Sequence, residues 1–303
     1  MSGPLDDRGA DDRPQAYDPA APLTASGNLR RRQAISKVTE WGATAAAVAA
    51  IVVLGIVIWT VVSRGASAIS WDFLTTSAPT GILPALVGSA IIVGIGTLIA
   101  APLGILIALY LTEYAGNRSA HLVKLTMDVM NGLPSIIIGL FVFALLVNKK
   151  QQSGFAGAIA LAIIMLPLIA RGTQEVLHLV PGSQREAADA LGVARWRTVL
   201  TVILPAALGG ILTATILSVA RAAGETAPLI LVSSIGPTNE VSFDPSQALA
   251  NIPVRVYSLS EEANPEGFTE AWGLALVLIA FILVASLGAR ALLARSKRKM
   301  MSS

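Results

Sequence analysis

The chain has 303 residues, of which 54% are hydrophobic and only 14% are charged, and its mean hydropathy is +0.67. This composition is too apolar for a soluble domain of this length and indicates a polytopic membrane protein of the all-α class. The formal net charge is +3, there is no cysteine, and there are two histidines, which excludes disulfides and predicts no metal site.

A tail rich in Asp, Arg, Pro, Ala and Gly occupies residues 1–38 and lacks hydrophobic periodicity. This composition predicts a disordered segment, and the tail does not have the form of a signal peptide. The first apolar run, residues 41–64, has about 23 residues and is long enough to cross a bilayer. Basic residues at 30–37 predict that this end stays in the cytoplasm.

Five more apolar runs follow along the chain. They cover residues 82–110, 125–147, 155–170, 206–234 and 271–293. The third is predicted to break at Pro134, which lacks the N–H that a helix needs. The six spans form a membrane domain over residues 39–294, and a basic tail at 295–303 lies in the cytoplasm with the N-terminus. The basic residues predicted outside are Arg64, Lys149, Lys150 and Arg255, a minority that agrees with the positive-inside tendency.

A polar loop at residues 182–205, between the fourth and fifth runs, carries its own helix signals. Ser183 followed by Glu186 has the form of a capping box, and Gly192 supplies a stop. A second short helical piece, residues 194–202, then leads to Pro205 and back into the membrane. The loop is therefore predicted to be a folded cytoplasmic element, and an ordinary amphipathic interface helix is the alternative interpretation.

The fifth run contains charged residues in the segment RAAGETAP, residues 221–228. Arg221 and Glu225 are four residues apart, which places them on one helix face, and the glycine and proline of the segment favour a local break. Ionisable groups at membrane depth usually face a polar path or one another. The two residues are either a neutralised structural pair or an anion site in which Arg221 donates hydrogen bonds and Glu225 restrains it.

Arg171, near the inner end of the fourth run, is a second candidate for the anion pathway. Its alternative interpretation is an arginine whose charged end extends to the membrane interface. Asp128 is expected either to cap the start of the third span or to pair with a neighbouring basic residue.

No catalytic or nucleotide site is predicted in this chain. A P-loop requires a Gly-Lys pair, and the sequence contains none. His121 and His178 lie at predicted membrane edges without partners at useful spacing. No cofactor is therefore expected here, and ATP hydrolysis, with its Mg²⁺, is expected on another polypeptide.

Several motifs resemble those of ABC-importer permeases. The polar loop resembles the EAA loop of these proteins. The matching positions are Glu186, Ala187, Ala188, Gly192, Val202, Leu204 and Pro205. The strings APLGILIALYLTEYA, PSIIIGLF, ARAAGETAPLI and NIPVRVY resemble the PstA family, one of the two permease families of phosphate-specific importers.

This resemblance implies a MetI-like, six-span permease in the bacterial plasma (inner) membrane that binds no nucleic acid. It implies a heterodimer with a PstC-like sister permease, a PstB-like ATPase dimer that docks on the loop, and a PstS-like phosphate-binding protein. The residues expected to couple to the ATPase are Glu186, Ala187, Ala188, Gly192, Arg195, Leu204 and Pro205. Those expected along the substrate pathway are Arg221, Glu225 and Arg171. The alternatives are a sulfate or molybdate permease and a secondary transporter that works without ATP.

Overall fold

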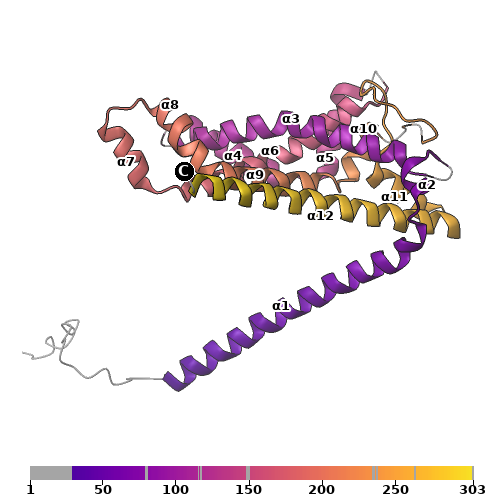
Figure 1. The fold of residues 1–303 in the computed structure, drawn as a ribbon, viewed down its shortest axis with the longest axis horizontal. Helices are drawn as coiled ribbons and strands as arrows, with labels where there is room; N and C mark the ends of the chain where they lie inside the picture. The colour runs from indigo at the N-terminus through magenta and orange to yellow at the C-terminus, as the bar shows by residue number, and fades with distance from the viewer. Residues whose placement is uncertain are drawn as a thin grey trace, which may run out of the picture. The chain divides into compact units, whose positions relative to one another are not determined.

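The computed structural model describes residues 29–78, 81–114, 116, 118–147, 151–233, 236, 238–262 and 264–301. These residues form helices and connecting segments, with no strand among them (Figure 1). The chain divides into two compact units, residues 1–57 and 58–303. The predicted disorder of residues 1–28 lies outside the described part of the chain.

Helix α1 (Leu29–Gly65) begins ten residues before the predicted end of the tail at residue 38. Residues 29–38 read LRRRQAISKV and contain neither glycine nor proline, and arginine, glutamine, alanine and lysine all favour helix. The helix therefore extends from the membrane-spanning run into the basic segment. Most of its large apolar side chains are exposed, as expected for a helix that faces lipid or another subunit.

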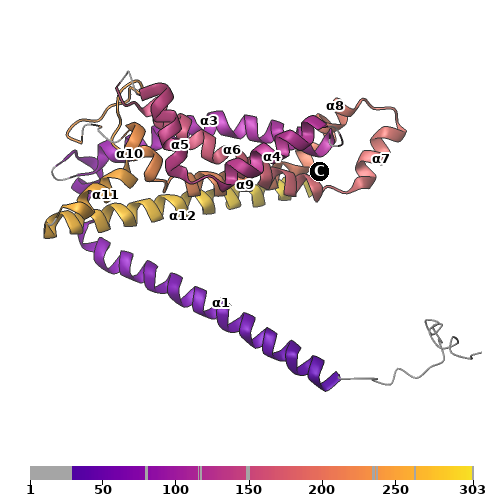
Figure 2. The same ribbon diagram turned by 180° about the vertical axis from the view of Figure 1, so that it is seen from behind.

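Helices α3 (Leu83–Glu113) and α6 (Gly154–His178) form the centre of the second unit, where they lie side by side (Figures 1 and 2). Within its most apolar 18-residue stretch, 67% of α6 is buried, compared with 28% of α3. Small residues permit this close packing, because a Cβ atom on Gly96 would lie 3.0 Å from the carbonyl oxygen of Ala158. Helix α6 is therefore the inner helix around which the others pack.

The third apolar run is sharply bent. It forms α4 (Arg118–Gly132) and α5 (Ser135–Val142), which is extended by a π-helical turn at Phe143–Val147, and the two parts meet at 103°. The predicted break at Pro134 is confirmed. Proline removes a backbone donor and disfavours helix at the residue before it, so α4 ends here. Within the described residues, five helices are long and apolar enough to cross a membrane, and the bent pair adds a sixth if it counts as one span.

The fifth run begins further upstream than predicted. Helix α8 (Arg195–Thr198) continues through a π-helical turn, Val199–Ile203, into α9 (Leu204–Ala222) without a break. Pro205 lacks an N–H group for the ladder, and the wider π turn that precedes it accommodates this loss. The predicted break near Gly224 is confirmed, because four residues separate the end of α9 at Ala222 from the start of α10 (Ala227–Ser233).

The segment between the fifth and sixth apolar runs contains α11 (Ile252–Glu261) and the start of α12 (Pro265–Met301). Asn251 caps α11, since its Oδ1 atom accepts a hydrogen bond from the N–H of Val254 at 3.1 Å. The Oγ atom of Ser89 on α3 accepts another from the N–H of Ile252 at 2.8 Å. Together these bonds attach the end of the loop to α3, opposite the end that carries α7 and α8 (Figure 1).

Two glycines of α3 allow this packing to be tested. A methyl group at Gly88 would fall on the carbonyl oxygen of Ala250, whereas one at Gly94 would meet no atom within 4 Å. We expect Gly88→Ala to lower the melting temperature of the detergent-purified protein, with an overpacking cost of about 1–3 kcal/mol. The matched control Gly94→Ala should leave the melting temperature unchanged or raise it slightly, because alanine favours helix over glycine by about 1 kcal/mol. Equal melting temperatures would contradict the close approach of α3 to residues 249–250.

Candidate coupling loop and transport groove

Helix α7 (Gly182–Ala190) lies at one end of the helix bundle, beyond the ends of the long helices (Figures 1 and 2). The predicted capping box is wrong. Pro181 occupies the cap position, Ser183 lies inside the first turn, and no side chain caps the helix. The fixed backbone angle of proline presets the entry to the helix, and the carbonyl of Pro181 accepts from the N–H of Gln184 at 3.2 Å. Glu186 is therefore free of a capping role and exposed.

Gly192 ends α7 as predicted. Its φ angle is +68°, in the left-handed region that glycine adopts without strain. Its N–H donates to the carbonyl of Asp189 at 3.0 Å, and the N–H of Val193 donates to the carbonyl of Ala188 at 3.1 Å. These two bonds make a Schellman motif, which satisfies the last carbonyls of the helix and turns the chain toward α8.

The residues predicted to couple to a partner do not all lie on the surface. Glu186, Ala187, Gly192, Arg195 and Pro205 are exposed, whereas Ala188 is buried and Leu204 is half-buried against the core of the bundle. Three large apolar side chains that the motif does not include are also exposed. These are Leu191, Trp196 and Leu200, at 82%, 58% and 54%. Exposed apolar side chains of this size are typical of surfaces that contact protein or membrane.

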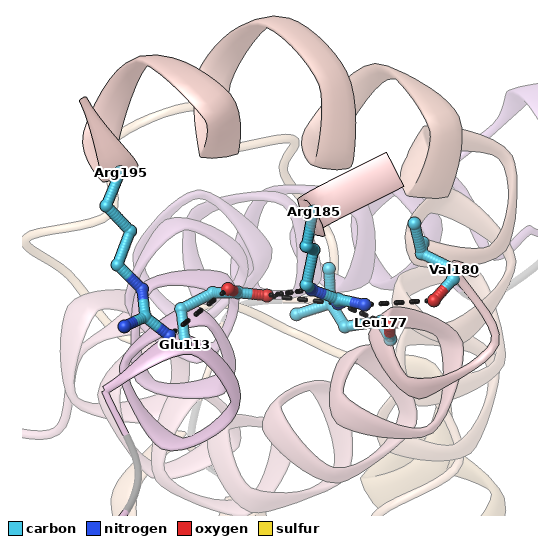
Figure 3. Close-up of polar contacts among 5 residues, drawn as sticks. All are labelled: Glu113, Leu177, Val180, Arg185 and Arg195. Carbon is cyan, nitrogen blue, oxygen red and sulfur yellow. Dashed lines mark hydrogen bonds and ion pairs between the residues drawn. The ribbon is translucent and has the colours of Figure 1, made fainter. Parts of the chain in front are cut away.

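Glu113, the last residue of α3, holds the loop at its base (Figure 3). Its side chain is only 3% exposed. The Nε and Nη2 atoms of Arg185 donate to its Oε1 atom at 3.2 and 3.1 Å. Arg195 lies on the other side, with its Nη2 atom 3.8 Å from Oε2. One buried carboxylate therefore joins α3 to the first turn of α7 and to the start of α8.

The remaining donors of Arg185 bind the end of α6. Its Nη1 atom donates to the carbonyl of Val180 at 2.9 Å, and its Nη2 atom donates to the carbonyl of Leu177 at 3.0 Å. A buried carboxylate that loses its only strong partner is destabilising, by up to about 3–5 kcal/mol for a fully buried pair. Sequence reasoning missed this cluster, since Glu113 and Arg185 are 72 residues apart and no local pattern joins them.

A groove with a volume of about 480 Å³ runs between α6 and α9. The residues that line it are Leu168, Gly172, Glu175, Val176, Gly210, Thr213, Ala214, Leu217, Ser218 and Arg221. Glycine forms its floor, because a Cβ atom on Gly172 would lie 2.7 Å from the Cβ atom of Ala214. The groove combines apolar walls with a few polar groups, which is the usual character of a small-molecule site.

Arg221 is exposed in this groove and lies in the last turn of α9. A cation is favoured there, because the free carbonyls at the end of a helix carry partial negative charge. The prediction that Arg221 and Glu225 share one helix face is wrong. The helix ends at Ala222, whose carbonyl accepts from the N–H of Glu225 at 3.1 Å, and these two described residues form no ion pair with each other. The structure therefore does not favour the neutralised pair.

Arg171 pairs with Asp128 on α4, with Nη2 to Oδ1 at 2.8 Å, which confirms that Asp128 bonds to a nearby basic residue. Both side chains are largely exposed, so the pair contributes little to stability. Arg171 is not among the residues that line the groove, whereas Glu175, one turn further along α6, is. The sequence did not single out Glu175, although a charged residue next to an apolar run was the signal available.

Comparisons with known proteins agree with this architecture. Residues 100–301 match the family described as "Binding-protein-dependent transport system inner membrane component". The chain is 38% identical over 282 residues to the phosphate transport system permease protein PstA 1 of Mycobacterium tuberculosis H37Rv, which covers 88% of this chain and 89% of that protein. It is 40% identical over 235 residues to the PstA protein of Haemophilus influenzae, which covers 75% of this chain and 82% of that protein.

Solved structures of ABC transporters share the fold. A bacterial transporter involved in the import of the acidic polysaccharide alginate aligns with a TM-score of 0.63 at 15% identity, over 87% of this chain and 99% of that chain. The MetNI methionine transporter in an inward-facing conformation aligns with a TM-score of 0.56 at 17% identity, over 71% of this chain and 93% of that chain. The predicted all-α, MetI-like permease fold is confirmed, and the chain belongs to the family of binding-protein-dependent transport system inner membrane components.

Proposed function

We propose that this chain is a transmembrane permease subunit of an ATP-driven importer of inorganic phosphate. The observation that carries this proposal is its 38–40% identity, over 75–88% of its length, to permeases named for phosphate transport. The exposed guanidinium of Arg221 in a membrane-depth groove suits a tetrahedral oxyanion, because its planar donors can form paired hydrogen bonds with two oxygens.

The groove is open on one side, so a second subunit is needed to enclose the pathway. We infer that a PstC-like sister permease covers it and that a PstS-like binding protein delivers phosphate to the opposite end from α7. The positive charge of Arg221 would attract the anion along this path, and residues of the sister permease would complete the site. Arg171 and Glu225 are proposed as further pathway residues, with Arg171 available to the anion only when it leaves Asp128, to which it is bonded at 2.8 Å.

The loop from α7 to α9 is proposed as the coupling element. Its exposed apolar side chains, Leu191 and Trp196 among them, are suited to a groove on a PstB-like ATPase dimer, which would bind the ATP and Mg²⁺. The chain itself would need no cofactor. Displacement of the loop by the ATPase would alter the groove between α6 and α9, and both termini and the loop would lie in the cytoplasm, as the distribution of basic residues predicts.

The direct test is uptake of radiolabelled phosphate by the complete complex, reconstituted in proteoliposomes. We expect uptake that requires ATP, is inhibited by vanadate, and is competed by arsenate rather than sulfate. Competition by sulfate or molybdate in place of arsenate would indicate a permease for another oxyanion. Uptake that persists without any ATPase would indicate a secondary transporter and would contradict the proposal.

Arg221→Ala should reduce phosphate uptake at least about tenfold, because it removes the one cation among the described residues that line the groove, while the complex still assembles. Arg221→Lys should be intermediate, since lysine keeps the charge but loses the paired donors. The measurement is uptake at equal amounts of assembled complex. Wild-type uptake by the alanine variant would show that Arg221 is only structural.

Gly192→Pro should uncouple ATP hydrolysis from transport, because proline cannot adopt the φ angle of +68° that ends α7. The matched control is Gly182→Pro at the first position of the same helix. Proline is tolerated there, and the extended Pro181 before it (φ −56°, ψ 134°) suits a following proline. Phosphate uptake and ATP hydrolysis are measured together. Coupled transport by the Gly192 variant would contradict the role of the loop.

The absence of cysteine allows the orientation to be tested with single-cysteine variants. We expect a membrane-impermeant maleimide to label Phe243→Cys in intact cells and Leu191→Cys only in inverted vesicles. Both positions are exposed, and the connection from α10 to α11, which contains residue 243, lies at the opposite end of the bundle from the connection between α7 and α8, which contains residue 191 (Figure 1). Expression without the ATPase keeps Leu191→Cys accessible, and restoring the ATPase should slow its labelling. Labelling of Leu191→Cys from outside the cell would overturn the proposed coupling.

A further inference from the structure

The cluster around Glu113 connects the exposed loop to the bundle through two contacts of different length, a short one to Arg185 and a longer one to Arg195. On one side, Arg185 is held by Glu113 and by the carbonyls of Leu177 and Val180, at distances of 2.9 to 3.2 Å. These four bonds join the first turn of α7 to the ends of both α3 and α6. Since α3 and α6 are the most closely packed pair, α7 and these two helices should move together.

The other side of the cluster is looser. Arg195 lies 3.8 Å from Glu113, and its side chain is 60% exposed. Its guanidinium also lies over the ring of Tyr114, with its central carbon 5.4 Å from the ring centroid. Arg195 begins α8, which runs without a break into α9 and its Arg221. The loose contact therefore lies between the end of α3 and the helix on the other side of the groove, which also packs directly on α6.

We propose that Glu113 is a positioning residue for energy coupling: it transmits displacement of α7 to α3 and α6 and lets α8 and α9 slip past them. The inference rests on the proposed function. Because the groove lies between α6 and α9, a shift of one helix against the other changes its width. Small residues bring the two helices together at this interface: Gly172 lies against Ala214, and Gly210 lies against the side chain of Val176.

A purely structural ion pair would behave differently from a coupling residue. Loss of a structural pair lowers stability and the amount of assembled complex, and phosphate uptake and ATP hydrolysis then fall in proportion. Loss of a coupling residue changes the number of phosphate ions moved per ATP hydrolysed. This ratio is therefore the quantity to measure, in proteoliposomes that contain both permeases and the ATPase, with phosphate-loaded binding protein.

Glu113→Gln keeps the size of the side chain and removes its charge. We expect the phosphate-to-ATP ratio to fall by roughly tenfold, within the usual range of coupling between two sites, while ATP hydrolysis stays within about twofold of wild type. The double variant Glu113→Gln with Arg185→Gln should be no worse than either single variant, since both remove the same connection.

Glu270→Gln is the matched control. Glu270 accepts hydrogen bonds from Arg255 through one oxygen at 3.0 and 3.1 Å, at the opposite end of the bundle, so the variant removes a similar ion pair that has no place in the coupling loop. The Glu270→Gln complex should move as many phosphate ions per ATP hydrolysed as the wild-type complex. An equal loss in both variants would assign the effect to general destabilisation and overturn the proposal.

A wild-type ratio in an assembled Glu113→Gln complex would also overturn it. If that variant fails to assemble, Arg185→Lys decides, because it keeps a cation beside the buried Glu113 but loses the paired donors that tie α7 to α3 and α6. We expect about a threefold or greater fall in its ratio, and a wild-type ratio would reject the proposal. Absence of ATP-dependent phosphate uptake by the wild-type complex would instead refute the proposed function itself.

Discussion

The close approach of α6 to its neighbours is the constraint on which the rest of the structure depends. In a membrane, helices associate through van der Waals contact and gain most when small residues bring their backbones together. Here Gly96 and Gly104 of α3 meet Ala158 and Ile169 of α6, and Gly172 of α6 meets Ala214 of α9. The polar side chains buried within these helices, such as Thr173 and Ser218, are small hydroxyl groups. The buried carboxylate of Glu113 lies at a helix end, and Arg221 lies in the open groove.

The buried Glu113 follows from this arrangement. A carboxylate at the end of α3 is close enough to the packed helix ends to lose its water, so it requires ionic partners. The loop supplies them from both of its short helices. The same contact that satisfies the charge also fixes the position of the first turn of α7. The free-energy cost of removing water from the Glu113 carboxylate is thus offset by its bonds to Arg185, and the same bonds give the loop a defined position.

Breaks in the helices likewise require that their polar backbone groups be satisfied. Non-helical backbone at membrane depth is tolerated where protein or water satisfies its polar groups. Residues 223–226 interrupt the path between α9 and α10, and the carbonyls of Arg221 and Ala222 accept hydrogen bonds from N–H groups within this break. The break therefore separates Arg221 from Glu225 and leaves the guanidinium exposed to whatever enters the groove.

Local patterns in the sequence determined the membrane class, the approximate spans, the breaks at Pro134 and near Gly224, and the stop at Gly192. Each of these depends on residues only a few positions apart, which interact in any fold. Which charges meet was decided by the tertiary structure. Glu113 finds Arg185 across 72 residues and Asp128 finds Arg171 across 43, because separate helices pack side by side. Arg221 and Glu225, which the spacing had paired, lie apart because the helix ends between them, and the groove exists only where α6 and α9 come together.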